Sequence, residues 1–223
     1  MTKIVCISDT HTYLDRVSVP SGDILVHSGD ATFDGTGPQI AQFNQHLEKH
    51  VDRFKHIIYV PGNHDFGFQD SEKIARKIMT NAIVLIDEAI EVEGIKFYGS
   101  PWQPWFRDWA FNFPERELGS HETATKTWAK IPNDTKVLLT HTPPYMMMDK
   151  TSETSRKNNN DRHVGCKSLA EKIKELLDLK LHVFGHIHEC YGEVKTSKVH
   201  FVNASICTRL GYNPTNAPIV VEI

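Results

Sequence analysis

Five short apolar segments, each leading directly into polar residues that can bind a metal, constrain the fold of this 223-residue chain more than any other feature. Short, continuous apolar runs of this kind are typical of strands that are covered on both faces of a sheet. The segments are Lys3–Ile7, Asp23–His27, His56–Val60, Lys136–Thr140 and Leu181–Phe184. In open α/β sheets, ligands bind where strands deliver their carboxyl ends, so we expect the residues that follow these strands to lie together.

Amphipathic segments lie between the strands and predict an α/β fold. Ile40, Phe43, Leu47 and Val51 recur at helical spacing after Pro38, which suits the first turn of a helix. Further helices are predicted over residues 71–79, 120–130 and 167–178, and further strands over residues 83–86, 89–92, 95–98, 191–195, 199–202 and 219–223. The side chains expected on the inner faces of the second and fourth helices are Ile74, Ile78, Leu169, Ile173, Leu176 and Leu177. Because no repeat, low-complexity tract or linker interrupts the chain, we expect one domain over residues 1–223.

The composition argues against several classes of protein. A formal charge of -3 does not favour a nucleic-acid binder, which usually has a basic face. No apolar run approaches the roughly 18 residues of a membrane span, and the first strand begins so close to Met1 that no signal peptide is expected. Cys6, Cys166, Cys190 and Cys207 form no C-x-x-C pair, so we expect reduced thiols in a cytoplasmic protein. No obligate protein partner is evident.

The residues that follow the five strands are of the kinds that bind transition metals. They are Asp9, His11, Asp30, Asn63, His141, His186 and His188. Two carboxylates, one amide and four imidazoles suit a pair of divalent ions such as Mn, Fe or Zn better than Ca or Mg alone. His186 and His188 are two residues apart in an extended segment, so both side chains can reach one site. If the ions lie about 3.5–4 Å apart, one carboxylate must bridge them, and Asp30, which follows Gly29, is the natural candidate.

The order of these residues resembles that of the calcineurin-like metallophosphoesterase superfamily. The shared motifs are D-T-H at residues 9–11, S-G-D at 28–30, G-N-H-D at 62–65, His141, and G-H-I-H at 185–188. The stretches GSPWQPWF, HVFGHIHE, VNASIC and PTNAPIV are similar to those of the metallophosphoesterase-domain (MPPED) phosphodiesterases, which have affinity for nucleotides. The resemblance covers nearly the whole chain. It implies a four-layer α/β sandwich, in which two mixed sheets are flanked by helices.

The resemblance also implies roles for the metal ligands. In that pattern the first ion is bound by Asp9, His11 and His188, the second by Asn63, His141 and His186, and Asp30 bridges the two. Some relatives lack the histidine that corresponds to His186. Because this chain keeps it, we expect two bound divalent ions.

The implied reaction is hydrolysis of a phosphodiester. Two divalent ions would lower the pKa of a bridging water, and the resulting hydroxide would attack phosphorus in line. Asn63 and His64 would contact the substrate, and His64 would donate a proton to the leaving oxygen. Asp65 would orient or charge-stabilise the imidazole of His64. The expected substrate is a small-molecule phosphodiester, with nucleotide-based diesters such as cyclic nucleotides as the candidates.

Three other functions are possible for a chain with these motifs, and each would require a sequence feature in addition to them or in their place. A nuclease of the same superfamily would carry a basic stripe or an added DNA-binding segment, and neither is evident. A protein phosphatase would carry an arginine pattern after the bridging aspartate, which SGDATFDG lacks. A non-catalytic scaffold would have a degenerate site, whereas all seven ligand positions and His64 are intact.

Two longer segments have both a structural and a functional interpretation. Residues 102–113 form either a satellite hydrophobic core or an aromatic wall that stacks a nucleobase. Their aromatic side chains are Trp102, Trp105, Phe106, Trp109, Phe111 and Phe113. Residues 142–165 are predicted to form a mobile loop, in which Arg156, Lys157, Arg162 and His163 are alternatively a clamp for a substrate phosphate. Asn203 and Ser205 follow a strand, which would bring them close to the pocket.

Overall fold

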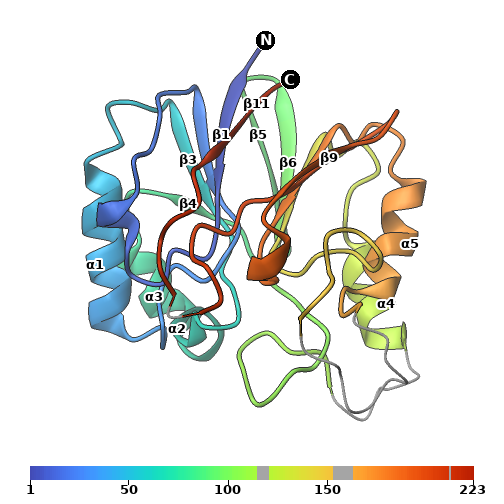
Figure 1. The fold of residues 1–223 in the computed structure, drawn as a ribbon, viewed down its shortest axis with the longest axis horizontal. Helices are drawn as coiled ribbons and strands as arrows, with labels where there is room; N and C mark the ends of the chain where they lie inside the picture. Colours follow the sequence, from blue (N-terminus) through green and yellow to red (C-terminus); the bar gives the residue numbers. More distant parts are fainter. Residues whose placement is uncertain (115–120, 153–162, 211) are drawn as a thin grey trace.

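The computed structural model describes residues 1–114, 121–152, 163–210 and 212–223, and two β-sheets pack face to face at its centre (Figure 1). The first sheet has the strand order β11-β1-β2-β3-β4, and the second has the order β5-β6-β7-β8-β10-β9. The strands are β1 (Lys3–Ile7), β2 (Ile24–His27), β3 (His56–Tyr59), β4 (Ile83–Val84), β5 (Glu88–Val92), β6 (Ile95–Ser100), β7 (Val137–Thr140), β8 (Leu181–Phe184), β9 (Gly192–Lys195), β10 (His200–Asn203) and β11 (Ile219–Glu222). In the first sheet only β11 is antiparallel to its neighbour, and in the second only the edge strands β5 and β9 are. Both sheets are therefore mixed, as the resemblance implies.

Helices cover the outer face of each sheet, which gives four layers (Figure 1). The helices are α1 (Gly37–Glu48), α2 (Phe66–Asp70) and α3 (Glu72–Ile78) on the first sheet, and α4 (His121–Ala129) and α5 (Lys167–Glu175) on the second. Two short 3-10 helices, η1 (Leu14–Arg16) and η3 (His188–Cys190), lie in loops. The predicted four-layer α/β sandwich is confirmed. Within the described parts of the chain, no helix is long and apolar enough to cross a bilayer.

The alternation of side chains along β1 explains why its sequence is apolar without interruption. Ile4 and Cys6 point into the core between the two sheets, whereas Val5 and Ile7 face the helices of the first layer. All four side chains are completely buried. A strand that is covered on both faces needs an apolar residue at every position, and this is the pattern that predicts such strands from the sequence. Cys6 and the three other cysteines are free, in agreement with the expectation of reduced thiols.

Two helices end earlier than their apolar spacing predicts. Helix α1 ends at Glu48, so Val51 lies beyond it and is 38% exposed. Helix α5 ends at Glu175, and Leu177 is 76% exposed. In both cases an apolar residue continues the helical spacing after the chain has turned away from the core. The predicted cap of α4, residue 120, lies outside the described residues.

Helix α3 turns only one of its two predicted inner residues, Ile78, toward the core. Ala75 and Met79, at its inner side and its end, are buried, whereas Ile74 is 62% exposed and Ile78 is only partly buried. Ala75, Ile78 and Met79 lie on one side of the helix and pack into the core of the first sheet, whereas Ile74 faces solvent. Spacing alone therefore indicates a helix here but does not identify its inner face.

The described ends of the segment 142–165, for which a mobile loop is predicted, make hydrogen bonds to a buried carboxylate, and residues 153–162 lie outside the described residues. The carboxylate of Asp149 is completely buried. It accepts hydrogen bonds from the backbone N–H groups of Met146 (3.0 Å) and Gly165 (2.9 Å) and from Nδ1 of His163 (2.6 Å). His163 is thus held in place by a structural contact. The other residues proposed for a phosphate clamp, Arg156, Lys157 and Arg162, lie outside the described residues.

The two ends of the chain lie side by side in the first sheet. Lys3 pairs with Glu222 across the antiparallel contact of β1 with β11. Backbone hydrogen bonds of 2.7 and 3.1 Å join Thr2 and Ile223 in both directions. Both termini lie at the end of the molecule opposite to the loops that follow β1, β2 and β3 (Figure 1).

A histidine in the second sheet is held in its neutral form. His182 lies in β8 and is completely buried. The hydroxyl of Thr140 donates to the Thr142 carbonyl (2.7 Å), so it accepts the Nε2–H of His182 (2.8 Å). The second ring nitrogen, Nδ1, has no hydrogen-bond partner among the described residues. Burial therefore lowers the pKa of His182 to about 3.

We predict that His182 makes the protein sensitive to acid. The pKa of His182 is about 3 in the folded protein and about 6.5 in the unfolded chain. At a pH between these values the unfolded chain binds more protons at this residue than the folded protein does, so the stability falls as the pH falls. One such histidine contributes up to about 1.4 kcal/mol per pH unit to this loss. His182→Gln keeps an N–H for Thr140. It should reduce the slope of the free energy of unfolding against pH by about that amount, as measured by denaturant unfolding between pH 6 and about pH 4. An unchanged slope would contradict this role of His182.

Candidate metal centre

The predicted ligands gather where the carboxyl ends of the two sheets meet. Asp9, Asp30 and Asn63 follow β1, β2 and β3 of the first sheet, and His141 and His186 follow β7 and β8 of the second. Backbone hydrogen bonds hold neighbouring loops together, from the Asp9 N–H to the Gly29 carbonyl (2.8 Å) and from the Gly185 N–H to the His141 carbonyl (3.1 Å). The side chains from five strand ends therefore face one another, as the sequence predicts.

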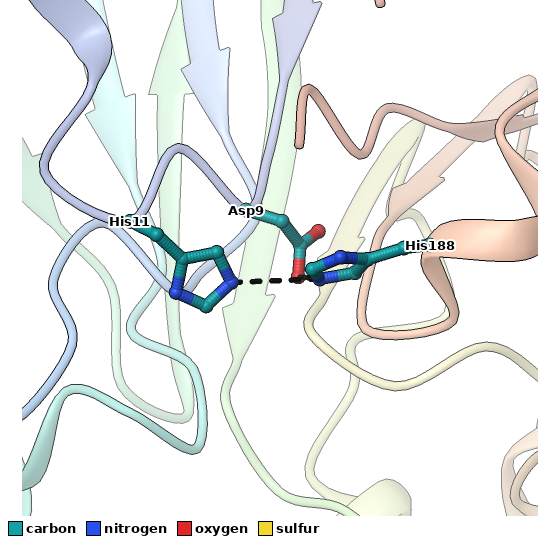
Figure 2. A group of neighbouring side chains, drawn as sticks. All are labelled: Asp9, His11 and His188. Atoms are coloured by element: carbon teal, nitrogen blue, oxygen red, sulfur yellow. Dashed lines mark hydrogen bonds and ion pairs between the residues drawn. The ribbon is translucent and has the colours of Figure 1, made fainter. Parts of the chain in front are cut away.

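Asp9, His11 and His188 form one group of potential ligands (Figure 2). Nε2 of His188 lies 3.0 Å from Oδ1 of Asp9 and 3.4 Å from Nε2 of His11. Asp9 and His11 are completely buried, whereas His188 is partly exposed. One donor atom from each of the three side chains lies within 4.8 Å of the others.

Asp30, Asn63, His141 and His186 form a second group. Nε2 of His141 lies 2.8 Å from Oδ1 of Asn63 and 3.4 Å from Oδ2 of Asp30. The rings of His141 and His186 are in contact, with centroids 4.9 Å apart. Oδ2 of Asp30 also lies 3.9 Å from Nε2 of His11. The carboxylate of Asp30 is thus located between the two groups.

The hydrogen bonds of these side chains suit ligands of a cation. Nδ1 of His141 lies 2.9 Å from the carbonyl of Ser28, which can only accept, so Nε2 is the nitrogen left to face Asn63 and Asp30. Metal-binding histidines commonly donate their second ring N–H in this way. The Asn63 amide nitrogen has no hydrogen-bond partner among the described residues, while its oxygen faces His141. Oxygens and imidazole nitrogens that converge in a buried space form a donor set for divalent transition ions.

The charges of Asp30 and His141 stabilise each other in this buried space. Burial raises the pKa of Asp30, but the His141 ring beside it, together with His64 and His11, holds it well below its usual range. Burial lowers the pKa of His141, and the Asp30 carboxylate raises it to about 9. Burial lowers the pKa of His11 to about 4 and that of His186 to about 3. The site thus combines the ionised carboxylate of Asp30 and a protonated His141 ring with the imidazoles of His11 and His186, which are neutral at physiological pH.

Two glycines let the loops come this close together. A Cβ atom at Gly185 would overlap the carboxylate of Asp9 and the hydroxyl of Ser8. A Cβ atom at Gly62 would overlap the carboxylate of Asp30. The glycines of the G-H-I-H and G-N-H-D motifs are therefore required by close approach of the backbone to the two carboxylates.

Several of the predicted ligands lie on strained backbone. The φ angles are 51° at Asp9, 40° at His11, 55° at Asp30 and 66° at His186, all in the left-handed region. Such a conformation costs a non-glycine residue on the order of 1–3 kcal/mol. Strain of this kind is concentrated at functional sites, where it directs side chains toward a ligand.

His64 lies at the open side of the cluster. Its ring is partly exposed and lies 4.9 Å from the ring of His11. Its backbone N–H donates to Oδ1 of Asp30 (2.8 Å), and its Nδ1–H donates to the carbonyl of Phe33 (2.7 Å). Nε2 is therefore the ring nitrogen that can exchange a proton with a bound ligand.

The environment of Asp65 differs from the expected one, in which it orients the ring of His64. Its buried carboxylate accepts hydrogen bonds from the backbone N–H groups of Asp30 (2.8 Å) and Thr32 (3.0 Å) and from the Thr32 hydroxyl (2.7 Å). Asp65 thus holds the turn that carries Asp30. The ring of His64 is oriented instead by the Phe33 carbonyl.

Asn203 and Ser205 lie behind Asp9, on the side of the second sheet. The hydroxyl of Ser205 is 2.9 Å from Oδ2 of Asp9 and 2.8 Å from Oδ1 of Asn203. The Asn203 amide donates to the carbonyl of Ile187 (2.9 Å), between the two histidines of the G-H-I-H motif. Ser205 therefore supports the Asp9 carboxylate from the opposite sheet. The sequence places these residues near the pocket but does not identify this contact.

The aromatic segment 102–113 divides into two parts. Trp102 packs against Phe111 and Phe113, with ring centroids 5.9 and 5.7 Å apart, and both phenylalanines are buried. Phe111 belongs to the core under α1–α3 and Phe113 to the core under α4 and α5, so this part extends the two main cores and is not the satellite core of the structural interpretation. Trp109 instead lies 4.6 Å from the ring of His64, and Trp105 is 37% exposed. The segment thus contributes to the two main cores and also supplies one aromatic ring beside the cluster of ligands.

Comparison with known proteins agrees with this arrangement. A model of the calcineurin-like phosphoesterase family matches residues 2–190. Metallophosphoesterase domain-containing protein 1 of Homo sapiens is 35% identical over 246 residues, which cover 100% of this chain and 71% of that protein. UPF0046 protein K07C11.7 of Caenorhabditis elegans is 33% identical over 235 residues, covering 99% of this chain and 75% of that protein.

A solved structure shares the fold. The crystal structure of a dimetal phosphatase from Danio rerio aligns with a TM-score of 0.50 at 12% sequence identity, over 97% of this chain and 90% of that one. The fold and the cluster of ligands define a metallophosphoesterase, a hydrolase of phosphate esters. The chain belongs to the calcineurin-like phosphoesterase family.

We predict that Gly185→Ala weakens metal binding by about 10–100-fold, the range for lost support of a ligand. The added methyl group would displace the carboxylate of Asp9, against which Gly185 packs. Metal content after dialysis against limiting Mn²⁺ measures the effect. Gly37→Ala is the matched control, because a Cβ atom there meets only Ile78 Cδ1, at 3.7 Å. Equal metal content in the two variants would show that close packing at Gly185 does not position Asp9.

Proposed function

We propose that this protein is a dinuclear metal-dependent phosphodiesterase that hydrolyses a small phosphodiester. The observation that carries the proposal is the convergence of seven potential ligands from five strand ends, with His64 at the open side of the cluster. The dimetal phosphatase that shares the fold supports two divalent ions here as well. Four free cysteines are consistent with a reducing, cytoplasmic compartment.

We assign the ligands to two cation sites. In this assignment Asp9, His11 and His188 would hold the first ion, Asn63, His141 and His186 would hold the second, and Asp30 would bridge them. The position of Asp30 supports the bridging role, because its Oδ2 lies 3.9 Å from Nε2 of His11 and 3.4 Å from Nε2 of His141. A mixed set of nitrogen and oxygen donors suits Mn, Fe or Zn.

When bound, two such ions lower the pKa of a water molecule between them and neutralise charge on the phosphate oxygens. The chain's own residues determine where this chemistry takes place. Asp9, His11 and Asp30 are almost completely buried, so bulk water is excluded from the inner side of the site and charge interactions there are strengthened. His64, His186 and His188 are partly exposed, so the substrate approaches from their side.

His64 donates a proton to the leaving oxygen in this proposal. The Phe33 carbonyl holds Nδ1–H, so Nε2 carries the proton that is transferred. The hydrogen bond from the His64 N–H to Asp30 keeps the proton donor at a fixed distance from the bridging carboxylate. Asn63, the preceding residue, would contact both the second ion and the substrate. Asp65 and Ser205 position Asp30 and Asp9 through the hydrogen bonds described above.

The preference for a diester is supported by the surroundings of His64. The aromatic rings near it are those of Trp109, at 4.6 Å, and Tyr212, at 6.3 Å. Apolar surfaces beside the proton donor suit the organic substituents of a diester, which carries a single negative charge. Nucleotide-based diesters, including cyclic nucleotides, are the candidate substrates.

We predict a metal-dependent preference for diesters over monoesters. The protein is stripped with a chelator and reloaded with Mn²⁺, and kcat/KM is compared for bis(p-nitrophenyl) phosphate and p-nitrophenyl phosphate. The diester should react at least about tenfold faster, a difference of about 1.4 kcal/mol in activation free energy. The stripped protein should be inactive. Preference for the monoester would indicate a phosphatase, and no turnover with two metals bound would indicate a scaffold.

We predict that His64→Ala slows hydrolysis without releasing metal. Loss of a general acid lowers the rate of hydrolysis by about 10²–10⁴-fold. The decrease should be greatest for diesters with poor alkoxide leaving groups. p-Nitrophenolate needs little protonation, so its release should be affected less. His56→Ala, at a partly exposed position paired with Glu93, is the control. A drop in metal content with unchanged turnover per bound site would show that His64 is a ligand instead.

A further inference from the structure

A buried histidine that is not among the candidate ligands joins two of the turns that form the metal centre. His27 is the last residue of β2, and its side chain is completely buried. Its Nδ1 accepts a hydrogen bond from the Gly29 N–H (3.2 Å), in the turn after β2. Nε2 therefore carries the ring hydrogen and donates it to the hydroxyl of Thr10 (2.9 Å), in the turn after β1. Both nitrogens of one ring thus connect two neighbouring turns.

Each of these turns carries candidate ligands on strained backbone. In the turn after β1, Thr10 lies between Asp9 and His11, whose φ angles are 51° and 40°. In the turn after β2, Asp30 has a φ angle of 55°. Residues keep such conformations only where their surroundings hold them in place. A side chain that contacts both turns next to the strained residues is therefore well placed to fix the distance between their ligands.

Packing fixes the ring of His27 and its protonation state. The ring makes edge contacts with the rings of Phe43 in α1 and Tyr59 in β3, with centroids 5.1 and 5.5 Å away. Burial lowers the pKa of His27 to about 3, so the ring is neutral at physiological pH. A neutral ring has one donor and one acceptor, which match the Thr10 hydroxyl and the Gly29 N–H.

A comparable histidine in the second sheet makes only one of these two contacts. His182 is also completely buried, and its Nε2–H donates to the hydroxyl of Thr140 (2.8 Å). Its Nδ1 has no hydrogen-bond partner among the described residues, whereas both ring nitrogens of His27 are paired. His27 is thus distinguished by the second contact, which joins one ligand-bearing turn to another.

We propose that His27 is a positioning residue of the metal centre, which holds the turn of Asp9 and His11 at a fixed distance from the turn of Asp30. The inference rests on the proposed function, in which these three side chains bind the first ion and bridge the pair. The other candidate ligands of the second ion follow β3, β7 and β8, whereas both hydrogen bonds of the His27 ring go to the turns after β1 and β2. Loss of the ring should therefore weaken the first ion more than the second.

The test measures binding of Mn²⁺ and not turnover. The metal-stripped protein is titrated with Mn²⁺ by isothermal calorimetry, and EPR spectroscopy distinguishes a coupled pair of ions from a single one. His188→Ala and His141→Ala, which each lack a candidate ligand of one ion, assign the two binding steps. His27→Phe keeps a ring but removes both hydrogen bonds. It should weaken the first ion about 10–100-fold, the range for lost support of a ligand, and the second by less than about threefold.

Two further variants show whether the hydrogen bonds themselves are responsible. His27→Gln places an amide N–H close to the position of Nε2, so it should keep the contact with Thr10 and restore part of the affinity for the first ion. Thr10→Val removes the same contact from the other side. Combined with His27→Phe, it should weaken the first ion little further, because the two residues share one hydrogen bond. Additive losses would show that the residues act independently.

His182→Phe is the matched control, because it removes an equally buried imidazole that is bonded to a threonine. Thermal melting of the metal-stripped proteins should show that both phenylalanine variants lose stability, but His182→Phe should keep the wild-type Kd for the first ion. Equal weakening of both ions in His27→Phe, or an unchanged affinity for the first, would overturn the inference. If His27→Phe does not fold, Thr10→Val must show the selective loss. Failure of the proposed function is a distinct result, because it leaves bis(p-nitrophenyl) phosphate unhydrolysed by the wild-type protein, whatever the metal affinities of the variants.

Discussion

The alignment of the two sheets depends on the contacts of the Asp9 carboxylate. It follows β1 of the first sheet, yet its partners come from the second: the His186 N–H at 3.1 Å, the His188 ring at 3.0 Å and the Ser205 hydroxyl at 2.9 Å. A completely buried carboxylate is stable only with partners of this kind. The apolar core between the sheets is non-directional, so it permits many relative positions of the sheets. The contacts of Asp9 select the relative position of the sheets in which the strand ends supply a single site.

Most of the fold is predictable from the sequence, because burial on both faces leaves a direct signature. The central strands β1, β2, β3, β7 and β8 coincide closely with apolar runs, whereas the edge strands β5 and β9 carry charged residues and are largely exposed. The inner face of α3 and the ends of α1 and α5 are not predictable in this way, since Ile74, Val51 and Leu177 continue a helical pattern but face solvent. Where an apolar residue lies outside the core, only the tertiary packing shows it.

The convergence of the candidate ligands is also predictable from the sequence, because each of them follows the end of a strand. The residues that support them are not. Phe33 orients His64 through its backbone carbonyl, which leaves no side-chain signal. Ser205 reaches Asp9, and Tyr212 reaches His11, across nearly the whole length of the chain, so neither contact follows from local spacing. Asp65 belongs to the G-N-H-D motif beside His64, but its carboxylate is directed to the Asp30 turn.

The neighbouring chain ends have a consequence for how this architecture can be combined with other proteins. The antiparallel contact of β1 with β11 brings both termini to one edge, opposite to the loops that bear the ligands (Figure 1). Only a short connection would be needed to join the ends, and new ends could be opened in an exposed turn elsewhere. For the same reason the whole sandwich can be inserted into a loop of a host protein with its ligand-bearing loops facing outward. Domain insertion and circular permutation are thus compatible with an intact metal centre.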